Sequence, residues 1–303
     1  MQKKALVIPS RGIGDGLLMM IVSNHLQKAG YETTICHPLL HELKSWFPNF
    51  HFSIKEDFFL FDRIIVQNDN SKFMDEIKKL RKNTKLKNVS FFYGGYNKKK
   101  HGPLEPWDFV FDLSLSMVEN IAAGSSRLLS TPYSKECGII VPSFLKKSVH
   151  PKRAVIHPIT KKEKSYPIKR FISIAGHLRE KGHEISFAMS PSEREKHLFL
   201  QDLGFGLPFL SNLSDLAAFI YESGHFIGLD SGPGHLASLL DIPSVIIGFD
   251  KKQMKLWQPG WRKASLVFPP KYLLNIKYLR LKQKFWKSFI SPKKVIKTFQ
   301  KIS

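Results

Sequence analysis

An alternation of apolar runs, glycine loops and helix-length stretches limits what this chain can fold into more than any other feature of its sequence. The apolar run Lys4–Pro9 is followed by the glycine-rich loop Ser10–Gly16, a helical stretch at Leu17–Ala29 and a second apolar run at Thr33–Cys36. Gly30 is well placed to end the helix, because glycine readily adopts the left-handed conformation of a C-terminal cap. A strand, a glycine loop, a helix and a strand in this order open a doubly wound α/β domain.

The same alternation restarts after Ser143–Arg153, a polar stretch with a proline that is typical of a linker. Strands that alternate with helices form parallel sheets. We therefore expect two Rossmann-like, doubly wound domains, at residues 1–148 and 149–270, that face a central cleft. Further strands are predicted at Arg63–Val66, Val89–Tyr93, Phe109–Leu113, Gly138–Val141, Ala154–His157, Glu184–Ala188, His225–Gly228 and Ser244–Gly248.

Positive charge is concentrated at the end of the chain. From Lys251 to Ser303 there are 15 Lys and Arg residues and no Asp or Glu, against a net charge of +22 for the whole chain. Apolar residues at helical spacing predict a long helix at Tyr272–Ile290. We expect the basic segment 271–303 to be helical and to pack back on the N-terminal domain.

So many like charges favour an anionic partner, either a nucleic-acid backbone or an anionic membrane surface. The alternative is a surface that is merely rich in lysine. A second basic area, Lys72–Lys100, is either a solvated helix face or a binding surface.

The composition excludes several classes of protein. With 303 residues and 43% hydrophobic residues the chain can bury a large core, so it is not intrinsically disordered. No apolar run has the roughly 18 residues that a membrane span needs. The first residues, MQKKALVIPSRG, lack the apolar region of a signal peptide. With only two cysteines, Cys36 and Cys137, a reducing, cytoplasmic location is expected.

The first glycine loop carries an acid where a phosphate-binding loop would present bare N–H groups. Its spacing, Gly12-Ile13-Gly14-Asp15-Gly16, is not the G-x-G-x-x-G of dinucleotide sites, so an NAD site is only weakly indicated. Asp15 is either an ordinary first-turn acid of a helix or a general base that faces the cleft. The glycines would let the loop approach a substrate closely.

A second loop, Gly228–Ala237, follows an apolar strand and opens a helix. Ser231, Gly232 and Gly234 can direct a hydroxyl and backbone N–H groups at an anion there, and His235 adds a donor that can be cationic. Thr160 and the lysines after it end another strand and form a second phosphate cradle. At the next junction Glu193 either accepts from ribose hydroxyls or caps a helix.

These motifs resemble glycosyltransferase family 9, the bacterial heptosyltransferases. The similarity covers residues 4–265 and is strongest in HPITKKEKSYPIKRF, SPSERE, LDSGPGHLASLL and KLWQPGW. It implies a GT-B fold, an ADP-activated sugar donor, typically a heptose, and an acceptor in the lipopolysaccharide inner core. The resemblance also implies roles for single residues. In the first half, Asp15 would be the base, and Arg11, Gly12 and Gly14 would form the acceptor-side loop. In the second half, Thr160 and Lys164 would bind the diphosphate and Glu193 would bind the nucleotide. The donor loop would comprise Asp230, Ser231, Gly232 and His235.

The chemistry expected from the residues agrees with this resemblance. The sequence has no Asp-x-Asp motif and no metal-ligand spacing, so we expect direct inverting displacement without a metal or cofactor. Such an enzyme would bind its nucleotide-sugar donor and an anionic glycolipid acceptor, and would lie on the cytoplasmic face of the inner membrane, as a monomer.

Three alternatives stay open. The first is a nucleic-acid-binding protein that uses the basic, aromatic C-terminal segment. The second is a nucleotide-dependent oxidoreductase, which the absence of an acid between His37 and Glu42 disfavours. The third is a catalytically inactive family member.

Overall fold

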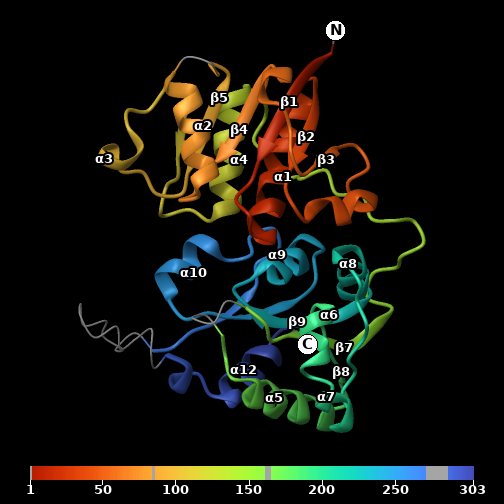
Figure 1. Cartoon of the computed structure of the whole chain (residues 1–303). Coiled ribbons are helices and arrows are strands. Elements are labelled where there is room, and N and C mark those ends of the chain that lie inside the picture. Colours follow the sequence, from red (N-terminus) through yellow and green to blue (C-terminus); the bar gives the residue numbers. More distant parts are fainter. Residues whose placement is uncertain (1, 84–85, 161–164, 271–285) are drawn as a thin grey trace. The chain divides into compact units, whose positions relative to one another are not determined.

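The computed structural model describes residues 2–83, 86–160, 165–270 and 286–303. The chain divides into two compact units, Met1–Pro142 and Ser143–Ser303, and each contains its own sheet (Figure 1). All paired strands are parallel, which confirms the predicted α/β class. Within the described ranges, no helix is both long enough and apolar enough to cross a membrane.

The first unit is built on a six-stranded sheet in the order β3-β2-β1-β4-β5-β6. Successive strands are added on one side of β1 up to β3 and on the other side from β4 onward, so the strand order reverses between β1 and β4. These two strands pair with Ile8 opposite Val66. Such a switch point leaves a crevice at the carboxyl ends of the two strands. The strands are β1 (Lys3–Ile8), β2 (Tyr31–Cys36), β3 (His51–Ser53), β4 (Arg63–Gln67), β5 (Val89–Tyr93) and β6 (Phe109–Val110).

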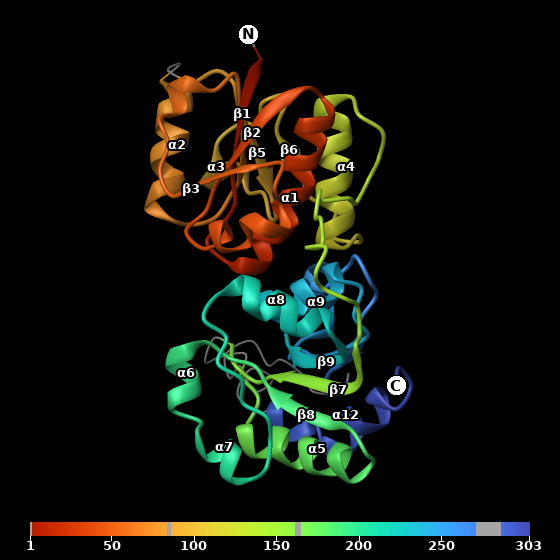
Figure 2. The same ribbon diagram turned by 90° about the vertical axis from the view of Figure 1, so that its right-hand side faces the viewer.

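Helices cover both faces of this sheet (Figure 2). One face carries two helices that pack against each other, and the other carries a single helix whose Met74 and Ile77 contact Leu6 and Val66 of the sheet. The helices are α1 (Ile13–Lys28) and α4 (Met117–Leu129) on the first face and α2 (Lys72–Lys82) on the second. Shorter helical turns are α3 (Lys98–His101) and the 3₁₀ helices η1 (Leu40–Trp46) and η2 (Phe58–Leu60).

The second unit has a five-stranded sheet in the order β11-β10-β9-β7-β8. Its switch point lies between β7 and β9, where His157 is opposite Gly228. The strands are β7 (His150–His157), β8 (Glu184–Phe187), β9 (Ser223–Leu229), β10 (Ser244–Ile247) and β11 (Ser265–Val267).

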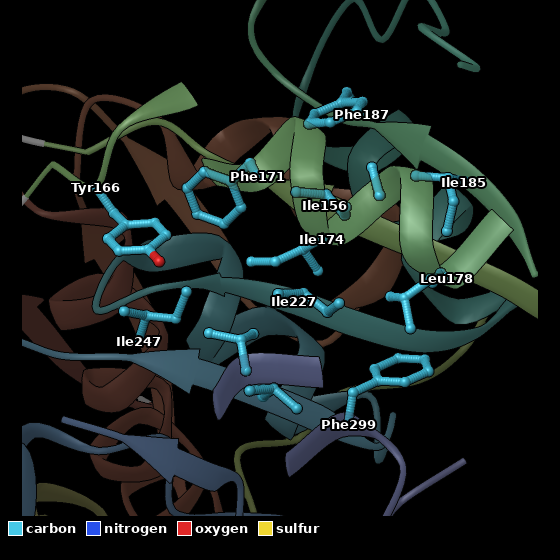
Figure 3. Close-up of a cluster of buried hydrophobic side chains, with 14 of the residues drawn as sticks. Ile156, Tyr166, Phe171, Ile174, Leu178, Ile185, Phe187, Ile227, Ile247 and Phe299 are labelled. Atoms are coloured by element: carbon cyan, nitrogen blue, oxygen red, sulfur yellow. The ribbon is translucent and has the colours of Figure 1, made fainter. Parts of the chain in front are cut away.

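One hydrophobic core of the second unit lies between this sheet and two helices, α5 (Ile168–Glu180) and α12 (Pro292–Phe299). Figure 3 shows Phe171, Ile174 and Leu178 of α5 and Phe299 of α12 converging on Ile227 of the sheet. The remaining helices are α6 (Pro191–Glu195), α7 (Phe199–Asp202), α8 (Leu213–Tyr221), α9 (Gly232–Leu239), α10 (Lys251–Trp257) and the 3₁₀ helix η4 (Trp286–Phe289).

The end of the chain departs from the prediction that it packs on the first unit. Residues 286–303 belong to the second unit, because Trp286, Ile290 and Phe299 are buried in its core. The Tyr166 hydroxyl donates to the carbonyl of Ile290 at 2.8 Å and anchors this segment. Most of the predicted helix Tyr272–Ile290 lies outside the described residues, and the part that is described, Trp286–Phe289, is a 3₁₀ turn.

Candidate functional site

The predicted site residues that the structure describes all lie in segments that follow the carboxyl ends of parallel strands. In the first unit the loop after β1 carries Asp15, next to the end of β4. In the second unit Thr160 follows β7, Glu193 follows β8 and Ser231 follows β9. In both units the segments next to the switch point therefore carry predicted residues, and ligands of α/β proteins bind at such points.

Asp15 is the third residue of α1, after the N-cap residue Gly12, and it is half-buried. The side chain of Gln67, the last residue of β4, donates from Nε2 to Asp15 Oδ1 at 2.7 Å. Gln67 Oε1 in turn accepts the backbone N–H of Ser10 at 3.2 Å. Gln67 thus joins the carboxylate to the loop that follows β1. Sequence reasoning missed this residue, since only the pairing of β1 with β4 brings it here.

Two glycines of the first loop lie against neighbouring side chains, Gly12 against Asp15 and Gly16 against Leu40. A β-carbon on Gly12 would lie 2.6 Å from Asp15 Oδ2, and one on Gly16 would lie 2.8 Å from Leu40 Cδ1. Both distances are shorter than real contacts allow, so a larger residue at either position would displace its neighbour. Arg11 and Gly12 are exposed and Gly14 is half-buried, so the predicted acceptor-side loop is accessible.

A buried histidine lies beneath the same loop. His37 Nδ1 accepts the backbone N–H groups of Leu39 and Leu40, at 3.2 and 3.3 Å, so its proton is on Nε2. Nε2 lies 3.3 Å from the position of a Gly16 β-carbon. Burial lowers the pKa of His37, and hydrogen bonding to the backbone of Gly12 and the two residues before it acts in the opposite direction. A neutral imidazole therefore supports the loop that carries Asp15.

In the second unit the predicted donor loop runs from the end of β9 into α9. Ser231 is the N-cap of α9, and its hydroxyl donates to the carbonyl of Leu229 at 3.2 Å. Gly234 is needed for close packing, because a β-carbon there would lie 3.0 Å from Ile246 Cδ1. Its N–H also donates to the carbonyl of Ser231 at 3.1 Å, so the start of the helix, at Gly232, is the part suited to an anion.

The other residues of the donor loop differ in their exposure. Asp230, Ser231 and Gly232 are half-buried, whereas His235 is 4% exposed. His235 is therefore covered by protein in this structure, and its role as a donor to substrate stays a prediction.

The loop after β7 is tied to the neighbouring strand by a second buried histidine. His157 Nδ1 donates to the carbonyl of Ala188, just after β8, at 2.8 Å. Burial lowers the pKa of His157, which favours the neutral form of its ring. Thr160, three residues further on, is half-buried. The predicted phosphate ligand Lys164 lies outside the described residues.

Glu193 occupies the first turn of α6, and its carboxylate pairs with Lys196 at 2.9 Å. This position suits a first-turn acid as well as it suits a ligand of a ribose, so the two interpretations stay open. In the part of the chain that the structure describes, no three His, Cys, Asp or Glu side chains are grouped as a metal site would need.

Comparison with known proteins agrees with this geometry. Residues 142–269 match the family model described as Glycosyltransferase family 9 (heptosyltransferase). No curated protein sequence matches the chain significantly. The family is the one that the sequence motifs resemble, so that prediction is confirmed.

Solved structures match nearly the whole chain at low identity. The structure of E. coli ADP-heptose LPS heptosyltransferase II has a TM-score of 0.72 at 16% identity and covers 99% of this chain and 98% of that one. A glycosyl transferase family 9 structure from Veillonella parvula has a TM-score of 0.72 at 16% identity and covers 100% and 98%. The structure of E. coli heptosyltransferase WaaC with ADP has a TM-score of 0.63 at 13% identity and covers 99% and 100%. These matches show a GT-B-like fold, as predicted.

Proposed function

We propose that this chain, a glycosyltransferase whose residues 142–269 form a family 9 (heptosyltransferase) domain, transfers a heptose from ADP-heptose to the inner core of lipopolysaccharide. The observation that carries the proposal is the placement of the motif residues. Ser231 and Thr160 follow the two strands of one switch point, and Asp15 lies beside Gln67 at the other. Neither of two alternatives, an oxidoreductase or a nucleic-acid-binding protein, accounts for the residues at both switch points.

The choice of donor is supported by the proteins that share this fold. The structures of E. coli WaaC include one with ADP and one with ADP-2-deoxy-2-fluoro heptose. In this chain the start of α9 at Gly232 would receive the diphosphate, because the N-terminus of a helix carries partial positive charge and N–H groups without partners in the helix. Thr160, Lys164 and His235 would add a hydroxyl and two further donors, and Glu193 would bind the ribose.

In the proposed reaction the acceptor hydroxyl attacks the anomeric carbon as the bond to the diphosphate breaks, which inverts the configuration. Asp15 takes the proton of that hydroxyl, and the electron pair of the broken bond leaves with ADP. The groups around Gly232 stabilise the charge that develops on the leaving phosphate. A carboxylate at the start of α1 is suited to this role, because it is half-buried and held by Gln67.

A basic surface at the same edge of the first sheet supports an anionic acceptor. The helix α3, which carries Lys98–Lys100, follows β5, and Lys100 Nζ contacts Asn70 in the loop after β4. Burial lowers the pKa of Lys78, and the charges of Lys100 and Arg81 also lower it, whereas those of Asp75 and Asp69 raise it. A phosphate or carboxylate of the acceptor would add a further favourable partner for these cations.

Such an acceptor is part of a membrane lipid, so the enzyme would work at the inner face of the inner membrane. The exposed lysines of the C-terminal segment, Lys293, Lys297 and Lys301, are suited to an anionic lipid surface. The membrane contact belongs to the proposal, as does the cytoplasmic location.

Calorimetric titration with ADP, UDP and GDP tests the donor class. We expect ADP to bind more tightly than UDP or GDP and to raise the melting temperature through mass action. Gly234→Ala, whose β-carbon would lie 3.0 Å from Ile246 Cδ1 and 3.3 Å from the carbonyl oxygen of Leu229, should weaken this binding, and Gly176→Ala, with open space around it, should leave it unchanged. Failure of all three nucleotides to bind would overturn the proposal.

A further inference from the structure

Gln67 is the polar side chain that joins Asp15 to the neighbouring strand, and it is 3% exposed. Only one orientation of its amide group satisfies both of its hydrogen bonds. The backbone N–H of Ser10 can only donate, so the group that it meets at 3.2 Å must be the amide oxygen, and the amide nitrogen must then face Asp15. Both hydrogen bonds are satisfied only while the Asp15 oxygen facing the amide accepts.

We propose that Gln67 is a positioning residue for catalysis, which holds the Asp15 carboxylate in the orientation that receives the proton of the acceptor hydroxyl. This inference rests on the proposed function of Asp15. The amide donates to Oδ1 at 2.7 Å, and Oδ2 lies on the side of Gly12. Loss of the amide would remove a hydrogen bond that fixes the orientation of the carboxylate, and small displacements of a reacting group are costly to rate.

The position of Gln67 follows from strand pairing. Ile8 of β1 lies opposite Val66 of β4, so the residue after Val66 lies next to the residues that leave β1. Parallel neighbours end at the same edge of the sheet, so Gln67 reaches the loop from a rigid strand. The burial of Gln67 fits a fixed support better than a side chain that rearranges around substrate.

The chemistry of an amide is required at this position. A leucine would fill similar space but donate nothing to Asp15 and accept nothing from Ser10. A glutamate could still accept from Ser10, but its second oxygen would face Asp15 Oδ1, and two carboxylates at this distance repel unless they share a proton. Substitution by Leu and by Glu therefore tests two separate properties of Gln67.

The test compares transfer kinetics of Gln67→Leu and Gln67→Glu with the wild type, using ADP-heptose and an inner-core acceptor from pH 6 to pH 8. We expect Gln67→Leu to lower kcat by about 10- to 100-fold at every pH, with ADP affinity unchanged. Gln67→Glu should be most impaired at pH 8 and should approach the wild type as the pH falls, because a shared proton restores the hydrogen bond. A merely structural role would not produce this pH-dependent rescue.

Asn88→Leu is the matched control. It too removes a side-chain amide, in this case one that donates to the backbone carbonyl of Phe61, just before the opposite end of β4. This variant should keep its kcat within twofold of the wild type. If Gln67→Leu also does so while Asp15→Asn is inactive, the positioning role is wrong and the base assignment stands.

A crystal structure of Gln67→Leu provides a readout that does not depend on turnover. We expect the Asp15 side chain to leave its present rotamer or to occupy more than one. An unchanged single rotamer would overturn the positioning role. An altered rotamer in this variant, together with a wild-type protein that transfers no sugar, would instead contradict the proposed function and leave the support of Asp15 by Gln67 intact.

Discussion

The Asp15 carboxylate has a close neighbour at each oxygen. Gln67 donates to Oδ1, and Oδ2 lies 2.6 Å from the position that a β-carbon of residue 12 would take. Gly12 is therefore needed for the space above the carboxylate, a reason different from the close approach of substrate that the sequence suggests. Both explanations require glycine at position 12. Only the packing explanation makes the orientation of Asp15 depend on that glycine.

Replacement of Gly12 by alanine tests this dependence. Because the new β-carbon would lie 2.6 Å from Asp15 Oδ2, the carboxylate must move. We expect Gly12→Ala to lower kcat by about 10- to 100-fold, measured in steady-state transfer assays.

Gly176→Ala, inside α5, is the control. No atom lies within 4 Å of its new β-carbon, so it should leave kcat unchanged and stabilise the protein by about 0.5–1 kcal/mol. Equal kcat for the Gly12→Ala protein and the wild type would contradict the packing explanation.

Histidines whose pKa is lowered by burial make stability depend on pH. Burial lowers the pKa of His25, His37, His157 and His225 below the ordinary value of 6.5. As the pH falls through 6.5, the unfolded chain binds protons before the folded one does. The free energy of unfolding should therefore decrease below pH 6.5, by at most about 1.4 kcal/mol per pH unit for each histidine.

Chemical denaturation at pH 8, 7, 6 and 5.5 measures this slope. His157→Gln, which can still donate to the carbonyl of Ala188, should make the slope shallower. His150→Gln, at an exposed position, should not change it. A free energy of unfolding that is the same at pH 8 and pH 5.5 would show that these histidines are not buried in the neutral form.

The site residues that could be predicted from the sequence are those within a local motif. Ser231 and Gly232 lie at a strand-to-helix junction, and the chemistry of such a junction can be read from adjacent residues. Gln67 and His37 could not be found in this way. Gln67 contacts Asp15 across 52 positions of the chain, and His37 reaches the first loop only after β2 is placed beside β1.

Among the elements, buried strands were the most predictable. Val89–Tyr93 forms β5 with the predicted bounds, and every residue in it is buried. Gly138–Val141, in contrast, was predicted as a strand but lies outside all strands, and Gly138 has a φ of +74°. The segment is instead tied to the end of η1, since the N–H of Ile140 donates to the carbonyl of Trp46, and a β-carbon on Gly138 would lie 2.7 Å from Phe50 Cε2.

The C-terminal segment contributes to the core of the second unit, which its basic composition does not indicate. Its lysines suggested a surface helix, but α12 also supplies Val295 and Phe299 to the core of the second unit. Phe299, which contacts the rings of His183 and His225, is fully buried. The apolar face of α12 is therefore part of the fold, and only its opposite face can serve a partner.

Substitution of Phe299 measures how much this helix contributes. We expect Phe299→Ala to lower the free energy of unfolding by about 3–5 kcal/mol. Phe144→Ala, at a side chain that is 80% exposed, should change it by less than about 0.5 kcal/mol. Equal stability of the two variants in urea titrations would mean that α12 does not belong to the core.

At the scale of the whole molecule, the net charge of +22 is the basis of the proposed contact with an anionic membrane. Replacement of Lys293, Lys297 and Lys301 by Gln should weaken binding to vesicles containing phosphatidylglycerol by about 1 kcal/mol for each lysine. Co-sedimentation measures this effect. The control is the same change at the exposed residues Lys44, Lys55 and Lys87 of the first unit, which alters net charge equally.

Two results would contradict the proposed membrane contact. The first is an equal loss of binding in the two triple variants, and the second is binding that does not need anionic lipid. Tighter, salt-dependent binding to RNA than to vesicles would favour a nucleic-acid partner instead.

The most direct test of the proposed function is transfer itself, measured by mass spectrometry of a heptose-deficient inner-core acceptor incubated with ADP-heptose. We predict that the wild type adds heptose and releases ADP. Asp15→Asn should be 10²- to 10⁴-fold slower with ADP affinity unchanged, the range typical for loss of a general base. Absence of transfer by the wild type, or near-normal turnover by Asp15→Asn, would contradict the proposal.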